Sequence, residues 1–359
     1  MKICFIGPAN SAHIVKWCRW FTEKGHEVHV ISFTPGSIED AQVHLIDLGV
    51  DPEGSDLGKL KYLLTGRKIR KLAEQIRPDV VNVHYATSYG AALALSGMKG
   101  YILSVWGSDV YDFPKKTPLH RALLKFSLKK AAHLFSTSRA MAEEAGRYTD
   151  KPFDITPFGV DMRLFQPGKR TRRADDGSFV IGTVKSLSDK YGIRYILEAA
   201  AEIRRGGEIP LRLRIAGKGP REQEYRRLAD QLGIGDITDW MGFISQQQAA
   251  EEWANMDAAI IPSNQESFGV SAVEAQACGV PVIISDIPGL MEATKPGETS
   301  IVVPRGDAHA IAEALRSLYA HPDKRIGMGE KGVAYVAEHY ELHRCFERIE
   351  ALFRQYAQG

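Results

Sequence analysis

Short runs of apolar, β-branched residues alternate along the whole chain with longer stretches in which apolar residues recur every three or four positions. The first pattern is typical of buried parallel strands and the second of amphipathic helices that cover a sheet. Their alternation predicts an α/β fold. Strands are expected at residues 2–6, 28–33, 43–48, 80–84, 101–105, 134–137 and 154–157, and then at 179–184, 211–216, 237–240, 257–262, 281–285 and 300–303.

The polar segment 166–177 separates two halves of this pattern. It carries proline and glycine and almost no apolar residue, so it cannot bury itself and is predicted to be a linker. A chain of 359 residues is also too long for one ordinary core. We therefore predict two doubly wound Rossmann-like domains, at 1–165 and 178–342, and a C-terminal helix over 343–359 that crosses back to the N-terminal domain.

In open parallel sheets, ligands bind outside the carboxyl ends of the strands, where loops and helix N-termini converge. Two such domains facing one another would enclose a deep cleft. The functional site is therefore expected in that cleft, on the loops that follow the strands.

Composition narrows the class of protein. With 44% hydrophobic and 25% charged residues the chain is typical of soluble globular proteins, and a net charge of +2 means that any basic surface must be local. Its four cysteines are scattered without Cys-x-x-Cys spacing, which favours reduced thiols in a cytosolic compartment and argues against a zinc site. No apolar run approaches a signal-peptide core or the roughly 18 residues of a membrane span. We expect a cytoplasmic protein without a bound metal, whose membrane contact, if any, would be peripheral on the inner face of the plasma membrane.

Glu266 and Glu274 are the most informative pair of residues. They lie between the predicted strands 257–262 and 281–285, in a segment that reads as strand, glycine-containing turn and helix. Such a unit places the first carboxylate at the strand end and the second on the helix, with free N–H groups between them. This arrangement suits a polar, phosphate-bearing ligand. Two solvated glutamates on a surface helix are the alternative.

The stretch from about 183 to 294 resembles the retaining family 4 glycosyltransferases, which have the GT-B fold of two Rossmann-like domains. The resemblance is carried by Glu266 to Glu274, by Ala277-Cys278-Gly279-Val280-Pro281 and by Ile215-Ala216-Gly217-Lys218-Gly219-Pro220. Before the linker, Gly159-Val160-Asp161 is similar to the family's segment at this place. The resemblance implies a retaining, metal-independent hexosyltransferase that needs no cofactor and takes a nucleotide-sugar, commonly UDP-linked, as its co-substrate.

The resemblance also implies roles for residues of the donor site. Lys185 and Lys190 match the basic pair at the donor diphosphate, although the first is usually arginine, and lysine gives up the bidentate geometry. Glu266 matches the carboxylate that holds sugar hydroxyls, and Glu274 the one that holds the ribose. Without the family, two lysines five residues apart are more often solvated surface residues. Further donor contacts are expected from Gly7, Phe243, Ser267, Phe268, Gly269 and Val270, mainly through backbone groups.

In the first half, the segment Gly7 to His13 matches the family's glycine loop after the first strand, but it lacks the Gly-x-Gly-x-x-Gly of a dehydrogenase. Trp106 stands where the family often has a histidine near the donor sugar. Asp109 is predicted to take a catalytic polar role there, with a turn or capping role as the alternative. Acceptor contacts are predicted for Asn10, Ser11, His13, His84 and Tyr85.

Two basic amphipathic segments bear on the acceptor. Residues 59–78 hold seven lysines and arginines against the single acid Glu74, and residues 115–130 hold six and no acid, interleaved with leucines. Such helices suit an anionic membrane surface, and a solvated face is the alternative. Neither has the interleaved stacking aromatics of a single-stranded nucleic-acid platform. The expected acceptor is a saccharide or lipid-linked saccharide in polysaccharide or glycoconjugate synthesis.

Two other functions fit the same fold. One is a nucleotide-sugar 2-epimerase, which needs additional acid and base groups, and the other is a non-catalytic nucleotide-sugar-binding protein. For the transferase, the sequence offers no nucleophile that matches a double displacement. A same-face transfer is therefore expected, in which a phosphate oxygen of the donor takes the acceptor's proton.

Overall fold

The computed structural model describes residues 1–48, 62–168, 177–207 and 209–357. The chain forms two compact units, of which the first contains Met1–Phe158 and the chain from Cys345 onward, and the second Gly159–Arg344. The first unit thus ends before residue 165, where we had placed its boundary. Val160 explains the difference, because its N–H donates to the Tyr340 carbonyl at 2.8 Å and its side chain is buried in the core of the second unit.

The first unit contains a seven-stranded sheet in the order β3-β2-β1-β4-β5-β6-β7. Every pairing in this sheet is parallel. All seven strands predicted for the first half are present, with ends shifted by a few residues. They are β1 (Lys2–Ile6), β2 (Glu27–Ser32), β3 (Gln42–Leu45), β4 (Val80–His84), β5 (Ile102–Val105), β6 (His133–Ser136) and β7 (Phe153–Ile155).

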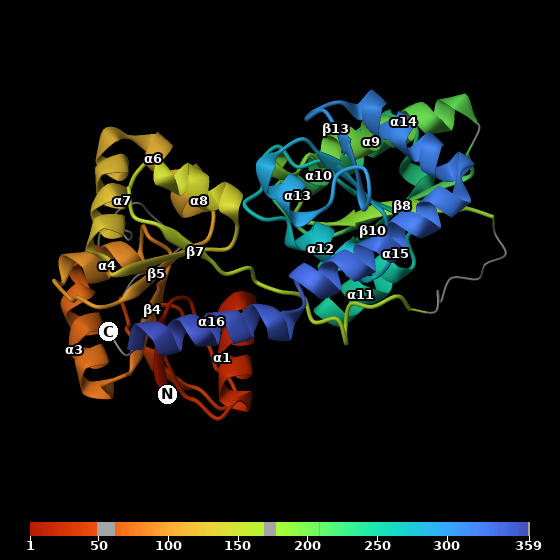
Figure 1. Cartoon of the computed structure of the whole chain (residues 1–359). Helices are drawn as coiled ribbons and strands as arrows, with labels where there is room; N and C mark the ends of the chain where they lie inside the picture. The colour runs from red at the N-terminus through yellow and green to blue at the C-terminus, as the bar shows by residue number, and fades with distance from the viewer. Residues whose placement is uncertain (49–61, 169–176, 208, 358–359) are drawn as a thin grey trace. The chain divides into compact units, whose positions relative to one another are not determined.

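Helices cover both faces of this sheet (Figure 1). On one face, apolar residues of α3, α4, α7 and α8 share a core with Val81, Val83 and Leu103 of the strands. On the other, Phe5 of β1 contacts Trp17 of α1 and Phe353 of the last helix, α16. The helices are α1 (Ala12–Glu23), α3 (Gly66–Ile76), α4 (Tyr89–Leu95), α5 (Ser108–Tyr111), α6 (Phe113–Lys116), α7 (Pro118–Lys130), α8 (Arg139–Gly146) and α16 (Leu342–Ala357).

The second unit contains a six-stranded parallel sheet in the order β10-β9-β8-β11-β12-β13. The six strands predicted for the second half are again all present. They are β8 (Phe179–Val184), β9 (Leu211–Ala216), β10 (Thr238–Gly242), β11 (Ala258–Ile261), β12 (Val282–Ser285) and β13 (Ser300–Val303).

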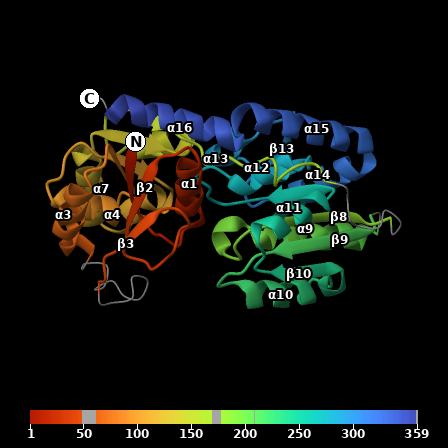
Figure 2. The ribbon, with the colours of Figure 1, turned by 90° about the horizontal axis from the view of Figure 1, so that it is seen from below.

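Alternate residues of these strands face two cores. Ile181, Leu213 and Ile260 pack with helices α9, α10 and α14. Val180 and Ala259 pack with α11, α12 and α13, and α15 contributes to both cores. Figure 2 shows the same helices from below. Their bounds are α9 (Ile193–Gly206), α10 (Glu222–Gln231), α11 (Gln246–Ala254), α12 (Val270–Ala277), α13 (Pro288–Ala293), α14 (Ala308–Ala320) and α15 (Pro322–His339), with short 3₁₀ turns η2 (Asp189–Tyr191) and η3 (Gly235–Ile237).

The strand order of each sheet reverses once, which confirms two doubly wound α/β domains. The reversal falls between β1 and β4 in the first unit and between β8 and β11 in the second. Doubly wound sheets bind their ligands at the carboxyl ends of the strands beside such a reversal. Most of the predicted site residues lie on the loops that follow these four strands, whereas Asp109 follows β5 and Phe243 follows β10. Glu274 lies in the helix that follows the loop after β11.

Candidate functional site

The loop after β8 presents Lys185 at the reversal point of the second sheet. The Lys185 N–H donates to the Ala216 carbonyl at 2.8 Å, which extends the pairing of β8 with β9 by one residue. Gly217 makes this approach possible, because a Cβ at Gly217 would lie 1.9 Å from the Lys185 carbonyl oxygen and the φ of Gly217 is +136°. Only glycine combines this conformation with this close contact.

Lys185 and Glu266 form a buried ion pair. The Lys185 Nζ lies 2.6 Å from Glu266 Oε2, and each side chain is only 11% exposed. The same Nζ lies 3.5 Å from Ser271 Oγ and 4.6 Å from the centre of the Tyr191 ring. Two loops that are distant in sequence therefore place one cation and one anion together in a partly dry site.

Electrostatics keeps this lysine charged. Burial by itself would lower the pKa of Lys185, but the charge of Glu266, with contributions from Tyr191 and Glu274, outweighs the burial and raises the pKa. Glu274, on α12, therefore lies within electrostatic reach of the Lys185–Glu266 pair. A cation that stays protonated in a desolvated site can stabilise negative charge on a bound ligand.

Helix α12 begins immediately beyond Glu266. Its N-cap is Gly269, with φ of +96°, where a Cβ would lie 2.6 Å from Leu290 Cδ2 of α13. The N–H groups at a helix N-terminus favour anionic or oxygen-rich ligands. Phe268 is buried against Tyr340, so it can offer a ligand only its backbone. Ser267 and Val270 are partly exposed.

Lys190 belongs to the same reversal point. Its carbonyl accepts the Asn264 N–H at 2.8 Å, and the Asn264 Nδ2 donates to the Asp189 carbonyl at 2.8 Å. These bonds join the loop after β8 to the loop after β11. The structure thus brings together Lys185, Lys190, Glu266 and Glu274, the four residues on which the predicted donor site depends.

Arg305 was not among the residues that we predicted for the site. Its Nη1 donates to the Asn264 carbonyl at 3.5 Å, so this guanidinium lies beside the loop after β11, whose Asn264 is bonded to Lys190. Arg305 follows β13, and a cation just beyond a predicted parallel strand is the signal that could have identified it.

Phe243 follows the edge strand β10, and its side chain is 79% exposed. The Gly217 N–H donates to the Gly242 carbonyl at 2.7 Å, which joins this loop to the one beside Lys185. A contact of Phe243 with the donor stays a prediction.

In the first unit, Trp106 is the centre of an aromatic cluster at the other reversal point. Its ring centre lies 5.5 Å from that of His13, 4.8 Å from His84 and 4.9 Å from Tyr85. His13 also stacks on Phe158 at 3.9 Å. Tyr85 has a positive φ of 71°, which is unusual for a non-glycine residue and is found preferentially at functional positions.

Gly7, Asn10 and Ser11 are the other predicted site residues of the glycine loop. Gly7 passes close to His84, since a Cβ on Gly7 would lie 3.3 Å from the His84 Cβ. Ser11 is the N-cap of α1, and the Asn10 Oδ1 accepts a hydrogen bond from Thr34 Oγ1 at 3.2 Å. Their contact with a ligand stays a prediction.

His84 does not lie where we expected it. We predicted that it contacts the acceptor, but its side chain is fully buried among Phe5, Trp17 and Trp106. Neither ring nitrogen has a hydrogen-bond partner among the described residues. His84 therefore packs against Trp106 from the core and presents no polar group to a ligand.

Asp109 is also buried, and its carboxylate is fully engaged. Oδ1 accepts the N–H groups of Trp106 at 3.1 Å and Gly107 at 2.9 Å, and Oδ2 accepts that of Ala86 at 3.0 Å. This is the geometry of the turn role that we considered as an alternative. Asp109 fixes the loops that carry Trp106 and Tyr85, so the predicted catalytic role is replaced by a positioning one.

The buried histidines predict how stability depends on pH. Burial lowers the pKa of His84 to about 3 and, together with Lys16, that of His13 to about 4. Below a pH of about 6.5 these two imidazoles take up protons in the unfolded chain but stay neutral in the folded chain. The free energy of unfolding therefore keeps their full contribution above pH 6.5 and decreases as the pH falls towards 3–4. The loss should approach about 1.4 kcal/mol per pH unit for each histidine.

A His84→Leu variant should therefore lose less of its melting temperature between pH 7.5 and 5.0 than the parent protein. His309→Gln is a control with the opposite expected sign, because Glu202 raises the pKa of the exposed His309. Protonated His309 stabilises the fold below pH 6.5, and this stabilisation is lost as pH rises, so the variant should lose more of its melting temperature on acidification than the parent. An unchanged pH dependence in His84→Leu would contradict the burial of a neutral imidazole.

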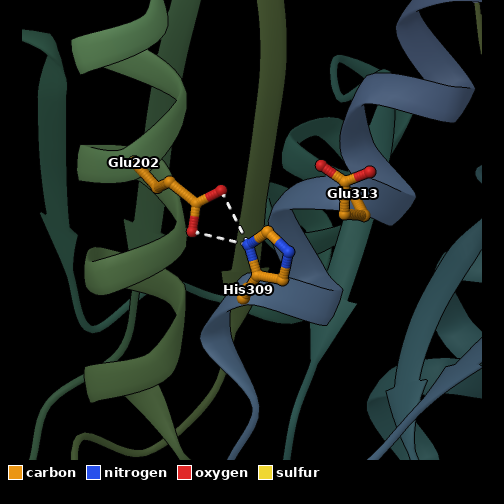
Figure 3. A group of neighbouring side chains, drawn as sticks. All are labelled: Glu202, His309 and Glu313. Carbon is orange, nitrogen blue, oxygen red and sulfur yellow. Dashed lines mark hydrogen bonds and ion pairs between the residues drawn. The ribbon is translucent and has the colours of Figure 1, made fainter.

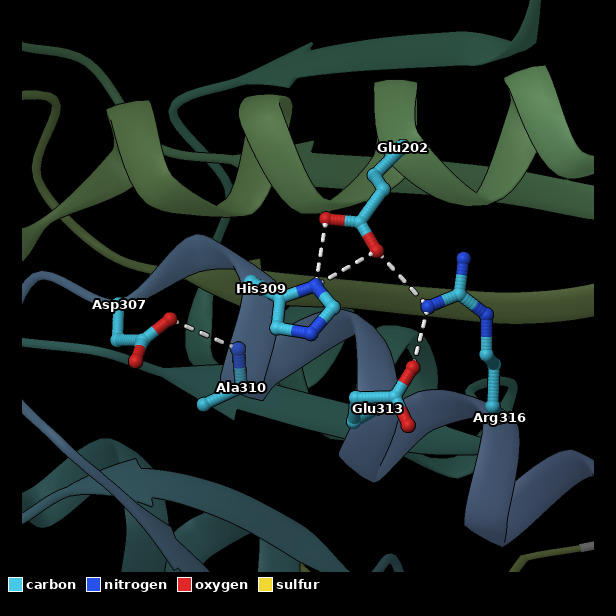
Figure 4. Close-up of polar contacts among 6 residues, drawn as sticks. All are labelled: Glu202, Asp307, His309, Ala310, Glu313 and Arg316. Atoms are coloured by element: carbon cyan, nitrogen blue, oxygen red, sulfur yellow. Dashed lines mark hydrogen bonds and ion pairs between the residues drawn. The ribbon is translucent and has the colours of Figure 1, made fainter.

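One group in the described part of the chain has metal-ligand side chains close together. Glu202 of α9 and His309 and Glu313 of α14 face one another (Figure 3). However, Arg316 Nη1 donates to Glu202 at 2.8 Å and to Glu313 at 2.5 Å, so a guanidinium already neutralises both carboxylates (Figure 4). The group is a surface ion-pair network between two helices.

Comparison with known proteins gives a consistent family. Residues 168–334 match the model of the glycosyl transferases group 1, and residues 2–138 match that of the glycosyl transferase 4-like family. A D-inositol 3-phosphate glycosyltransferase of Pseudarthrobacter chlorophenolicus is 29% identical over 73% of this chain and 67% of its own length. The enzyme of the same name from Paenarthrobacter aurescens is 31% identical over 64% of this chain and 59% of its own length.

Solved structures agree on the fold. The sucrose-phosphate synthase of Thermosynechococcus elongatus superimposes with a TM-score of 0.82 at 19% identity over 99% of both chains. Anabaena HepE in complex with UDP and glucose gives a TM-score of 0.80 at 16% identity, also over 99% of both chains. Two family models that together span most of the sequence, on two doubly wound domains, lead to one conclusion: the chain belongs to the group 1, family 4-like glycosyltransferases with the GT-B fold.

Proposed function

We propose that the protein is a retaining glycosyltransferase that moves a hexose or N-acetylhexosamine from a UDP-sugar to a saccharide or lipid-linked saccharide. The observation that carries this proposal is the buried pair Lys185–Glu266 beside the N-terminus of α12, at the reversal point of the second sheet. The complexes of Anabaena HepE with UDP and with UDP-glucose support the choice of nucleotide.

The leaving group determines what the site must do. As the glycosidic bond breaks, negative charge accumulates on the diphosphate, and fixed cations in a partly dry site stabilise this charge better than water does. Lys185 and Lys190 would supply the cations, and the first N–H groups of α12 would supply dipoles. In the free protein Glu266 neutralises Lys185, so a bound diphosphate would share this ammonium with the carboxylate.

Glu266 would also orient the sugar by accepting hydrogen bonds from its hydroxyl groups. The acceptor oxygen bonds to the anomeric carbon on the face from which the diphosphate departs, and a phosphate oxygen of the leaving group takes the acceptor's proton. This step retains the anomeric configuration and requires neither a protein nucleophile nor a metal. Orientation and charge stabilisation would supply most of the acceleration.

The direct test is transfer itself. The protein is screened by thermal shift with UDP- and GDP-sugars, because a ligand that binds only the folded state raises its melting temperature. Donors that give a shift are then incubated with saccharide acceptors in the presence of EDTA, and the anomeric configuration of the product is read by NMR. Inverted product, or activity only with a divalent metal, would contradict the mechanism. Isomerised sugar without any transfer would favour the 2-epimerase.

Glu274 provides a separate prediction for nucleotide binding. If it holds both ribose hydroxyls, Glu274→Ala should lose most of the thermal shift that UDP gives to the parent protein. Glu330→Ala, which removes an exposed glutamate from α15, is the matched control and should keep the full shift. A Glu274→Ala protein that binds UDP as the parent does would refute the ribose assignment.

A further inference from the structure

Helices α6 and α7 expose a dense set of cations. We use the name α6–α7 surface for Lys115, Lys116, Arg121, Lys125, Lys129 and Lys130, all of which are exposed. The sequence from Phe113 to Lys130 contains no aspartate or glutamate. Because the net charge of the whole chain is only +2, this surface is a local concentration of positive charge.

The packing of α7 fixes which side of the helix faces outward. Leu124 and Leu128 are fully buried against the sheet, in the same core as Tyr101 and Leu134. The exposed residues occupy the remaining faces of the helix. Leu119, in the first turn, is 76% exposed, so a large apolar side chain lies among the cations.

Little in the described structure neutralises these cations. Lys115 Nζ lies 3.8 Å from Glu144 of α8, a distance at the limit of an ion pair. Lys130 Nζ lies 5.5 Å from the centre of the Phe126 ring, which leaves its charge intact. Arg121, Lys125 and Lys129 form no ion pair with any described acidic residue.

The surface continues across neighbouring helices. Helix α4 contacts both α7 and α3, and the three lie on one side of the sheet (Figure 1). Leu95, at the end of α4, is half exposed, and Arg67, Lys68 and Lys71 of α3 are exposed as well. Here the charge is partly neutralised, because Arg70 pairs with Glu74 at 2.7 Å.

We propose that the α6–α7 surface docks the protein on an anionic lipid bilayer. Several lysines and arginines on a helix, with apolar side chains between them, match a surface of negative headgroups above hydrocarbon. No helix in the described ranges is long and apolar enough to cross a bilayer, so the contact is interfacial. This proposal does not depend on the donor site in the second unit.

Co-sedimentation with vesicles tests the docking. The full chain is mixed with phosphatidylcholine vesicles that contain or lack phosphatidylglycerol, at low and at high salt. We expect binding only to the anionic vesicles, and we expect it to weaken strongly as salt screens the charges. Binding to neutral vesicles alone, or no binding to anionic vesicles at low salt, would overturn the proposal.

Charge reversal locates the surface. The triple variant Arg121→Glu, Lys125→Glu and Lys129→Glu should bind anionic vesicles at least about a hundredfold more weakly than the parent, since each cation near such a surface contributes severalfold. The control reverses three exposed cations of the second unit, Arg205→Glu, Arg227→Glu and Lys331→Glu, with the same change in net charge. Equal loss in both triple variants would show that binding depends only on overall charge and would contradict a specific surface.

The apolar side chain and the competing partner are tested separately. Each variant must keep the melting temperature of the parent, and Leu119→Ser should weaken vesicle binding by a smaller factor without changing net charge.

Nucleic acid is the competing partner for a cationic surface. If single-stranded RNA bound the α6–α7 surface and displaced the protein from anionic vesicles, the surface would be assigned to nucleic-acid binding instead. UDP-induced thermal shifts are measured in parallel, so a failure of the docking and a failure of the donor site remain distinguishable.

Discussion

Replacing Lys185 by methionine is expected to reduce sugar transfer by about a hundredfold to a thousandfold. Methionine keeps the length of the side chain and removes the charge, so the departing diphosphate loses a cation in a partly dry site, where removing one such group costs about 10²–10³ in rate. It also leaves Glu266 buried without its partner, and the loss of one member of a buried ion pair costs about 3–5 kcal/mol of stability. The melting temperature should therefore fall together with activity.

Lys185→Arg is the matched control. Arginine is the residue that the family usually has at this position, and it restores the charge with two donor groups instead of one. Most of the activity and of the melting temperature should return. Full activity in Lys185→Met would exclude this side chain from stabilising the leaving group, whatever its effect on stability.

Replacing Glu266 by alanine is expected to reduce turnover by at least about a hundredfold while UDP binding changes little. The carboxylate is proposed to hold hydroxyl groups of the transferred sugar, which UDP itself does not contain. Its removal should therefore impair the orientation of that sugar and lower kcat. The ammonium of Lys185, released from its pair, remains available to the diphosphate. Transfer rates with the UDP-sugar and titration with UDP measure the two effects separately.

Glu266→Gln distinguishes charge from hydrogen bonding. The amide can accept a hydrogen bond from a sugar hydroxyl but cannot neutralise Lys185, so it should retain part of the turnover if the sugar contact dominates. Equal turnover of Glu266→Ala and the parent would reject the role at the sugar. A loss of UDP affinity as large as the loss of turnover would instead make Glu266 a support for Lys185 alone.

The fold was predictable because its signal is repeated along the chain. Each buried strand, such as Val80–His84 or Val282–Ser285, is a short β-branched run between helical stretches, and parallel strands buried on both faces produce such runs. The family resemblance implied the same arrangement of two Rossmann-like domains, but the order of the strands was not predicted. The first domain boundary was not predicted correctly, because Val160 and Phe165 precede the polar linker and their packing in the second core is a tertiary contact that the sequence does not reveal.

The donor residues were predictable for a similar reason. Lys185 and Glu266 follow strands that lie side by side in any doubly wound sheet, so a sequence position at the strand end translates directly into proximity. His84 also ends a strand, yet its side chain is buried. Position along a strand does not reveal what covers it, and the covering rings come from Trp17 and Trp106 of other loops and helices.

Asp109 shows a second kind of limit. Its hydrogen-bond partner Ala86 is 23 residues away in sequence, on the loop after a neighbouring strand. No local pattern distinguishes a carboxylate that binds a substrate from one that fixes two loops by accepting backbone N–H groups. The two roles differ only in tertiary contacts.

A crystal structure with a bound, non-hydrolysable UDP-sugar tests the central claim most directly. We expect a diphosphate within hydrogen-bond distance of the Lys185 ammonium and the first N–H groups of α12, with the ribose hydroxyls bound to Glu274 and a sugar hydroxyl bound to Glu266. A diphosphate bound in the second unit away from Lys185, with the Lys185–Glu266 pair unchanged and without a ligand, would contradict it.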